Sequence, residues 1–355
     1  MRTRVAVVFG GASVEREVSI VSARTIAGGF PPDRYDVVPV AIDAAGNFRG
    51  DADSRAILRG GFDAAPAASG RLPPGRFDGV DLAFPIVHGE TGEDGTLQGF
   101  FETLGIPYAG SDVAGSALGM NKAAFKARMR EAGLPVARSI AVDEAAWRTG
   151  AASFADRVAE RLPLPIFVKP SAGGSSLGVS KVKAWEDLPE AAREAFAYDR
   201  TILIEEGIDA REIECAILGN DDPEASGCGE IVPGREFYDY DDKYITDGAR
   251  LLVPAPLPAE VAGEVRALAV RAFSVAGCGG FARVDFFVEK GTGRVVLNEV
   301  NTLPGFTSIS MYPKLWEHAG LPLPELLDRI ARLAFERSES KKRAAAARPA
   351  PRKIG

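Results

Sequence analysis

The sequence is short of the residues that build metal–thiolate sites and disulfide frameworks. Its 355 residues include 3 cysteines and 2 histidines. The cysteines, Cys215, Cys228 and Cys278, form no CxxC pair. So few cysteine and histidine side chains argue against a zinc or haem site. We expect the three cysteines to be buried free thiols.

Long apolar runs are missing as well. No stretch of about 18 uninterrupted apolar residues occurs, which argues against a membrane-spanning helix. The opening, MRTRVAVVFGG, passes from two arginines through a short strand-like run into a glycine turn. That pattern does not predict a signal peptide. We therefore expect a cytoplasmic protein with no membrane partner.

Positive charge is scarce outside the C-terminal end. The chain has 42 Lys and Arg against 49 Asp and Glu, a formal net charge of −7. Residues 338–355 hold six basic residues and one acidic residue, so the rest of the chain is more acidic still. Such a surface disfavours a nucleic-acid partner. We expect this Ala-, Pro- and Arg-rich tail to be disordered, with attachment to nucleic acid or another surface as the alternative.

Apolar patterning predicts an α/β protein. The length predicts two or three domains, and 46% hydrophobic with 26% charged residues is ordinary for a globular chain. A strand at 5–9, a glycine turn and an amphipathic helix at 14–26 begin an α/β layer. A second apolar run at 82–87 leads through a glycine-rich acidic loop to a helix at 97–104. We interpret residues 43–79 as surface loop.

The remaining pattern mixes strands and helices. A helical stretch at 115–129 contains the first domain boundary, near residue 121. We expect two strands joined by a small-residue loop at 166–169 and 178–182, a helix at 185–196 and a strand at 202–205. Later we expect strands at 213–218, 229–231, 252–253, 281–288 and 295–299, with helices at 260–276 and 324–337. The predicted domains are 1–121, 122–212 and 213–337, followed by the tail 338–355.

The most informative chemical cluster is Arg283-Val284-Asp285, joined by a turn at 290–293 to Glu299-Val300-Asn301. Side chains alternate along a strand, so an antiparallel pair would present Arg283, Asp285, Glu299 and Asn301 on one face. Carboxylate and amide oxygens suit Mg²⁺ that keeps waters and shares phosphates. The alternative is a solvated sheet face with an ordinary salt bridge, but the apolar flanks indicate a core hairpin.

A second cluster is Lys169 with the loop 171–178, which is rich in glycine and serine. Small residues let backbone N–H groups approach phosphate oxygens, and Lys169 adds a positive charge. Lys122 could add another. The loop is not a Walker motif, and no GxGxxG follows the first strand. A plain hairpin turn is the alternative.

Acidic residues mark two further places. Glu205 and Glu206 end an apolar strand, with Glu212 close behind, where they could meet a purine and a ribose; an exposed charge cluster is the alternative. Glu15 and Glu17 lie in the first turns of the first helix, where the helix dipole favours anions, although helix capping could explain one of them.

Two loops complete the candidate site. The aromatic loop 234–244 has the features of a lid, with an oligomer contact as the alternative. In the turn after Asn301, Gly305 offers an unobstructed backbone N–H, as an oxyanion donor requires. Ser308 and Ser310 could hold a substrate carboxylate or cap the following segment.

Six motifs in the same order resemble the D-alanine:D-alanine ligases, which belong to the ATP-grasp superfamily. They are GGASVEREVS at 10–19, HGETGEDGT at 88–96, VKPSAGGSSLGVSKV at 168–182, YDYDDKY at 238–244, GFARVD at 280–285 and NEVNTLPGFTS at 298–308. The resemblance covers residues 4–336. It implies an N-terminal parallel-sheet α/β domain, a small central lid-like domain and a C-terminal domain with a metal-binding hairpin.

The resemblance also implies the activity. ATP would phosphorylate the carboxylate of one D-alanine, and the amine of a second would attack the acylphosphate to give D-alanyl-D-alanine for peptidoglycan synthesis in the cytoplasm. ADP and phosphate would be released. The cofactors would be ATP and two Mg²⁺ ions, with Mn²⁺ as a substitute, and the assembly would be a homodimer.

Roles follow by motif matching. The metal ligands would be Asp285, Glu299 and Asn301. ATP would contact Lys122, Lys169, Ser176, Glu205, Glu206, Ile208, Glu212, Lys243, Phe287, Asn298 and Glu299. The two D-alanines would contact Glu15, His88, Arg283, Gly305, Ser310 and Met311. The catalytic group would be Glu15, Ser175, Tyr244, Arg283 and Gly305, in which Glu15, Ser175 and Tyr244 form a hydrogen-bonded triad.

Some features bear on the second substrate. Tyr244 favours the dipeptide, because relatives that make D-alanyl-D-lactate carry histidine there. Asn121 stands where many members have aspartate, and Leu303 with Phe306 resembles the branch that includes the lactate enzymes. Two alternatives to the whole assignment are another ATP-grasp carboxylate–amine ligase and a non-catalytic nucleotide-binding protein. Glu15, His88, Ser175 and Tyr244 argue against the first, and the complete metal and arginine set against the second.

Overall fold

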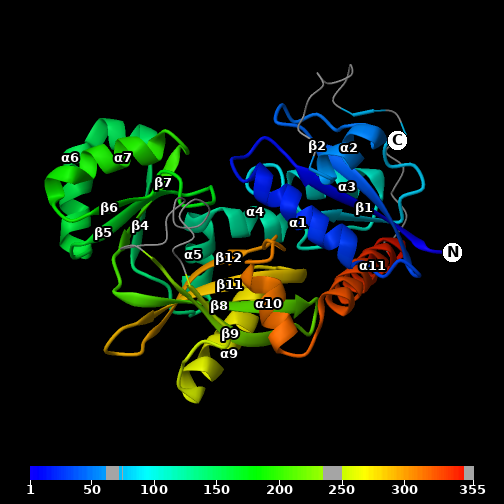
Figure 1. Ribbon diagram of the computed structural model, residues 1–355. Helices are drawn as coiled ribbons and strands as arrows, with labels where there is room; N and C mark the ends of the chain where they lie inside the picture. The colour runs from blue at the N-terminus through cyan, green and yellow to red at the C-terminus, as the bar shows by residue number, and fades with distance from the viewer. Residues whose placement is uncertain (61–71, 74, 235–249, 348–355) are drawn as a thin grey trace.

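The computed structural model describes residues 1–60, 72–73, 75–234 and 250–347. Three sheets, one from each successive part of the chain, form its framework (Figure 1). The first is parallel, in the order β2-β1-β3. Its strands are β1 (Thr3–Gly10), β2 (Tyr35–Ile42) and β3 (Leu82–Pro85), with helices α1 (Arg16–Gly29), α2 (Asp51–Leu58) and α3 (Thr96–Leu104).

The opening of the chain forms the central strand of this sheet. Residues 5–9 are all completely buried, as expected for a parallel strand that is covered on both faces. The strand ends at Gly10, whose φ of 93° is in the left-handed region. A Cβ there would lie 2.2 Å from the Ile42 carbonyl oxygen, so only glycine fits. This turn delivers the chain to Glu15 at the start of α1.

The second sheet is antiparallel, in the order β4-β7-β5-β6. Its strands are β4 (Ser139–Asp143), β5 (Ile166–Pro170), β6 (Ser180–Val182) and β7 (Thr201–Glu206). Helices α6 (Glu144–Arg161) and α7 (Leu188–Phe196), with the short 3-10 helix η1 (Trp185–Asp187), cover it (Figure 1).

The third sheet is also antiparallel, in the order β10-β9-β8-β11-β12. Its strands are β8 (Ala210–Gly219), β9 (Glu224–Val232), β10 (Arg250–Leu252), β11 (Gly280–Glu289) and β12 (Val295–Asn301). The helices around it are α4 (Val113–Met120), α5 (Lys122–Glu131), α9 (Ala259–Val275), α10 (Met311–His318) and α11 (Leu323–Ala346). The predicted hairpin at 281–288 and 295–299 is confirmed.

The first and third sheets share one hydrophobic core. Phe84 of β3 packs against Phe281 of β11 and against Phe306, with ring centroids 5.9 and 6.2 Å apart. Leu327 and Ile330 of α11 are completely buried in the same cluster. Burying such side chains contributes about 1.5–3 kcal/mol each. Because this core joins the two sheets, it fixes the position of Glu15 relative to the acidic hairpin.

Two predictions about unstructured segments were wrong. The described residues of this range, 43–60, 72–73 and 75–79, include α2, a buried ion pair of Arg49 with Asp43 at 3.5 Å, and a pair of buried Arg76 with exposed Asp51 at 2.6 Å. The tail is not disordered over 338–346, because α11 continues through these residues and Lys341 pairs with Glu102. In the described parts of both segments, charged residues find partners distant in sequence, Asp51 for Arg76 and Glu102 for Lys341.

Other features were missed or confirmed. The sequence pattern predicted no element for β2, β4, α6 or α10, and Gly150, with non-helical φ and ψ, interrupts α6. The helical stretch at 115–129 is two helices, divided at Asn121. The three cysteines are buried free thiols, as predicted. Among the described helices, none combines the length and apolar character that crossing a membrane requires.

Candidate active site

One cleft, with a volume of about 1440 Å³, receives side chains from all three sheets. Every predicted site residue in the described part of the chain lines it: Glu15, His88, Lys122, Lys169, Ser175, Ser176, Glu205, Glu206, Ile208, Glu212, Arg283, Asp285, Phe287, Asn298, Glu299, Asn301, Gly305, Ser310 and Met311. Lys243 and Tyr244, with most of the predicted lid loop, lie outside the described residues.

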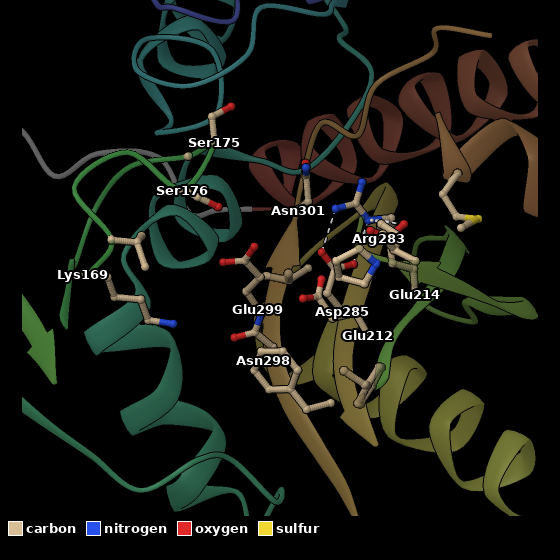
Figure 2. Close-up of a pocket in the computed structure, with 18 of the residues that line it drawn as sticks. Lys169, Ser175, Ser176, Glu212, Glu214, Arg283, Asp285, Asn298, Glu299 and Asn301 are labelled. Carbon is tan, nitrogen blue, oxygen red and sulfur yellow. Dashed lines mark hydrogen bonds and ion pairs between the residues drawn. The ribbon is translucent and has the colours of Figure 1, made fainter. Parts of the chain in front are cut away.

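The acidic hairpin forms one wall of the cleft. Arg283 pairs with Asn301 and Asp285 with Glu299 across β11 and β12, in the register that the alternation predicted. A bulge follows, so that Phe286 pairs with Leu297 and Asn298 is the extra residue. A bulge turns a strand locally. Asn298 and Glu299, although adjacent in sequence, therefore both line the cleft (Figure 2).

Arg283 is held from two sides. Its Nε and Nη2 donate to the two carboxylate oxygens of Asp285 at 2.8 and 2.7 Å, and its Nε lies 3.1 Å from Glu214 Oε2. Burial alone would lower the pKa of Arg283, but the two carboxylates outweigh burial and raise it. Glu214 was missed by the sequence analysis. Glu214 is two residues after Glu212 on the same strand, so the two side chains were expected on the same face of the sheet.

The donors of this wall fit a hard divalent cation. Asp285 and Glu299 supply carboxylate oxygens from neighbouring strands, and Asn301 supplies an amide oxygen that also accepts from the Leu303 backbone N–H at 3.1 Å. Within the described ranges, no group of three or more His, Cys, Asp or Glu could hold a metal ion. Two carboxylates and an amide leave coordination positions for water and phosphates, as Mg²⁺ requires.

The loop between β5 and β6 lies over the opposite wall. Lys122 Nζ donates to the Gly173 carbonyl oxygen at 2.7 Å and lies 3.3 Å from Glu299 Oε2, so it connects loop and hairpin. Ser175 and Ser176 have φ of 52° and 58°, the strained left-handed region. Figure 2 shows Ser176 and Lys169 across the cleft from Glu299. The loop is therefore more than a simple hairpin turn.

The same loop approaches the start of α1. A Cβ on Gly174 would lie 3.0 Å from Glu15 Oε2, which places this glycine close to the carboxylate. Ser175 is 8% exposed, and its buried hydroxyl has no hydrogen-bond partner in the part of the chain described here. Two of the three predicted triad residues are thus brought to the same end of the cleft.

The acidic residues at the end of β7 do not form an exposed charge cluster. Glu205 and Glu206 are 3% and 9% exposed. Glu206 pairs with Arg138, whose Nε lies 2.6 Å from Oε2 and whose backbone N–H donates to Oε1 at 3.0 Å. Glu205 lies between Lys169 and Lys126, a lysine that the sequence analysis missed. Lys126 is four residues after Lys122 on the same helix, so the two side chains were expected on the same helix face.

At the same end of the cleft as Glu15, His88 is buried beside Glu93. Its Nδ1 lies 3.7 Å from Glu93 Oε1, and Glu93 Oε2 accepts from the Gly89 backbone N–H at 3.0 Å. Burial disfavours the charged imidazole, but Glu93 and then Glu15 outweigh it and raise the pKa of His88. Glu93 was missed, although it belongs to the acidic loop that was noted in the sequence.

Replacing Glu93 by Gln should lower the pKa of His88, because burial of the imidazole is then no longer outweighed by that carboxylate. Because the pKa of His88 is raised in the folded protein, its contribution to stability is lost as pH rises through the folded pKa; burial also raises the pKa of Glu93, so the ion pair is lost again when that carboxylate is protonated at low pH. NMR titration of the histidine Cε1 protons checks this, and His318→Gln assigns the two signals. An unchanged His88 titration in Glu93→Gln would contradict it.

The turn after β12 faces Glu15 from the C-terminal part. Ser22 Oγ of α1 accepts from the Phe306 backbone N–H at 3.0 Å, which ties this turn to the first helix. Ser310 Oγ accepts from the Thr307 N–H at 2.9 Å and does not cap α10. A Cβ on Gly305 would lie 2.8 Å from Ser310 Oγ, so glycine keeps this corner open.

Comparisons with known proteins agree over nearly the whole chain. The family profile described as D-ala D-ala ligase N-terminus matches residues 4–111, and the profile described as D-ala D-ala ligase C-terminus matches residues 128–332. A D-alanine--D-alanine ligase of Chlorobium phaeovibrioides is 47% identical over 349 residues, 94% of this chain and 97% of the relative. D-alanine--D-alanine ligase A of Salmonella typhimurium is 46% identical over 356 residues, 95% and 96% of the two chains.

Solved structures share the fold. The D-alanine-D-alanine ligase from Coxiella burnetii superposes with a TM-score of 0.84 at 34% identity and covers 97% of each chain. The VanG D-Ala:D-Ser ligase from Enterococcus faecalis gives a TM-score of 0.82 at 34% identity, over 94% of this chain and 100% of its own. Both likenesses extend across all three sheets.

Proposed function

The chain belongs to the D-alanine–D-alanine ligase family of ATP-grasp enzymes, and from that premise we propose how its cleft carries out the reaction. It joins D-alanine to D-alanine with ATP in peptidoglycan synthesis. The observation that carries the assignment of residues is the convergence of every described candidate on one cleft, with Asp285 facing Glu299 across β11 and β12.

We propose two chemical steps. A carboxylate oxygen of the first D-alanine attacks the γ-phosphorus of ATP, so an O–P bond forms, the bond to ADP breaks and a D-alanyl phosphate results. The ammonium group of the second D-alanine gives one proton to solvent, the resulting amine attacks the acyl carbon, and the nitrogen loses a second proton to solvent as the amide forms. A C–N bond forms through a tetrahedral intermediate, the C–O bond to phosphate breaks and phosphate leaves. Positioning and charge neutralisation dominate such a reaction.

The hairpin wall would serve the nucleotide phosphates. Asp285, Glu299 and Asn301 would hold two Mg²⁺ ions, or Mn²⁺ in their place. When bound, these cations neutralise phosphate charge. Arg283, fixed by Glu214 and Asp285, would present its guanidinium to the oxygens on which negative charge develops. The Gly305 N–H would donate to the same oxygens.

Positive side chains of the opposite wall would orient ATP. Lys122, Lys169 and Lys243 would contact phosphates, with Ser176 in the loop above them. Glu205, Glu206 and Ile208 would border adenine, Glu212 would hold ribose, and Phe287 and Asn298 would line the nucleotide site. The burial of Glu205 supports a role in binding, because a desolvated carboxylate forms stronger hydrogen bonds.

The two amino acids would occupy the end of the cleft near α1. Glu15 would hold the ammonium group of the first D-alanine beside His88, and Ser310 with Met311 would receive the carboxylate of the second. Glu15, Ser175 and Tyr244 would form the triad that joins the lid loop to the first substrate. Tyr244 favours D-alanine over D-lactate as acceptor.

Domain roles and assembly follow as proposals. Residues 1–121 would bind the first D-alanine, 122–212 would cover ATP, and 213–337 would hold the metals. The enzyme would act as a homodimer in the cytoplasm, as its resemblance to the D-alanine:D-alanine ligases implies. Glu15, His88 and Ser175 in the cleft favour this ligase over another ATP-grasp carboxylate–amine ligase.

The purified protein should release phosphate when ATP, Mg²⁺ and D-alanine are all present, and L-alanine should not substitute. A coupled phosphate assay gives the rate, and mass spectrometry identifies D-alanyl-D-alanine. Adding D-lactate to D-alanine at several pH values tests the acceptor, because the ammonium group of D-alanine must be deprotonated before its nitrogen can attack, whereas the hydroxyl of D-lactate has no protonated form in this pH range. Phosphate release that ignores the configuration of alanine would contradict the proposal.

A further inference from the structure

Lys126 is a buried charge that none of the roles above uses. It lies on α5 four residues after Lys122, so both lysines project from the same face of the helix. Lys122 reaches Glu299 and the loop carbonyl of Gly173. The Lys126 side chain is 1% exposed and does not line the cleft. A lysine so completely buried is rare unless it is paired.

The partner of Lys126 is Glu205. Lys126 Nζ lies 2.6 Å from Glu205 Oε1, and Lys169 pairs with the other oxygen, Oε2. Glu205 is therefore shared by a lysine from beneath and a lysine from the cleft wall. Burial alone would raise the pKa of Glu205, but the two lysines outweigh it and lower the pKa. The carboxylate is thus kept charged, whereas burial lowers the pKa of Lys126, and Glu205 opposes this shift without cancelling it.

The two lysines differ in what else they can reach. Lys169 lines the cleft, is 12% exposed, and can turn toward a phosphate. Lys126 is enclosed, so it stays with Glu205 whatever occupies the cleft. Lys126 then holds Oε1 of Glu205, and Oε2 becomes available to a ligand whenever Lys169 turns away from it.

We propose that Lys126 is a positioning residue that fixes Glu205 as a charged acceptor and thereby sets the base selectivity of the nucleotide site. This rests on the proposed use of ATP with Glu205 beside the base. A charged carboxylate accepts from the 6-amino group of adenine. It repels the 6-oxo group of hypoxanthine or guanine, because both groups are then acceptors.

The Lys126→Met variant tests this, with inosine triphosphate as the probe that replaces the 6-amino group by an oxo group. We expect the wild type to prefer ATP over inosine triphosphate in kcat/KM by about 100-fold or more. In the variant this ratio should fall roughly tenfold, since one charge-assisted hydrogen bond is weakened. KM for ATP should rise, while kcat at saturating ATP stays within about threefold.

Arg128→Met is the matched control, because Arg128 is on the same helix but exposed and pairs with Glu131. It should leave the ratio unchanged. A Lys126→Met protein whose kcat falls equally with both nucleotides, at an unchanged ratio, would overturn the proposal in favour of a merely structural role. A wild type that uses neither nucleotide with D-alanine would instead contradict the proposed function.

A second comparison applies even if the single variant fails to fold. Glu205→Gln removes the charged acceptor and should lower the ratio as Lys126→Met does. Adding Lys126→Met to Glu205→Gln removes both buried charges together, which limits the cost of leaving either one unpaired. If Lys126 acts through Glu205, the double variant keeps the ratio of Glu205→Gln within about twofold. A further fall would overturn the proposal.

Discussion

Replacing Glu299 by Gln is expected to lower kcat by about 100-fold or more, because charge neutralisation by a bound divalent cation is worth several kcal/mol. Glutamine keeps the size of the side chain and removes one of the two negative charges that face each other across β11 and β12. Lys122 loses an ion pair but keeps its hydrogen bond to the Gly173 carbonyl oxygen, so the fold should be retained.

Two measurements check this prediction. Phosphate release with ATP and D-alanine is followed as Mg²⁺ is raised, and Mn²⁺ binding is followed by electron paramagnetic resonance. The control is Glu289→Gln, the same substitution at the far end of β11, where Glu289 pairs with Arg294. Normal turnover and unchanged Mn²⁺ affinity in Glu299→Gln would exclude Glu299 from the metal site.

Arg283→Gln should damage both activity and stability. Loss of one donor to developing negative charge typically lowers kcat by about 10²–10³-fold. Removing the cation also leaves Asp285 and Glu214, whose side chains are 14% and 7% exposed, side by side without compensation. Breaking a buried pair in this way costs about 3–5 kcal/mol of unfolding free energy.

A double variant separates the two effects. Glu214→Gln added to Arg283→Gln removes one of the stranded carboxylates, so denaturant unfolding should show part of the stability restored. Turnover should stay as low as in the single variant, because the guanidinium is still missing. Recovery of turnover together with stability would mean that Arg283 acts through the fold alone.

Local patterns predicted what depends on neighbours in the chain. Alternation along 281–288 and 295–299, with a glycine-containing turn between them, was enough to place Asp285 opposite Glu299. A continuous apolar run before Gly10 was enough for the central strand of the first sheet. In each case the side-chain period and the turn chemistry act over a few residues, so no distant contact was needed.

The bulge after Asp285 lay beyond such patterns. It places Asn298 and Glu299 in the cleft together, against the simple alternation. Helix α2 and the pair of Arg76 with Asp51 were missed for a similar reason, since these two residues are 25 positions apart in the sequence. The helix through 338–346 likewise has Lys341 beside Glu102 of α3. Composition alone describes such segments as loops or tails.

The sequence by itself determined the α/β character of the chain, the acidic hairpin and most of the candidate site residues, because strand period, glycine turns and motif order are written along the chain. Only the tertiary structure decided which buried charges stand together: Lys126 beneath Glu205, Glu214 behind Arg283 and Glu93 beside His88. A desolvated charge needs a partner within a few ångströms in space. That partner comes from whichever helix or strand packs against the buried charge, and this element can be distant in sequence.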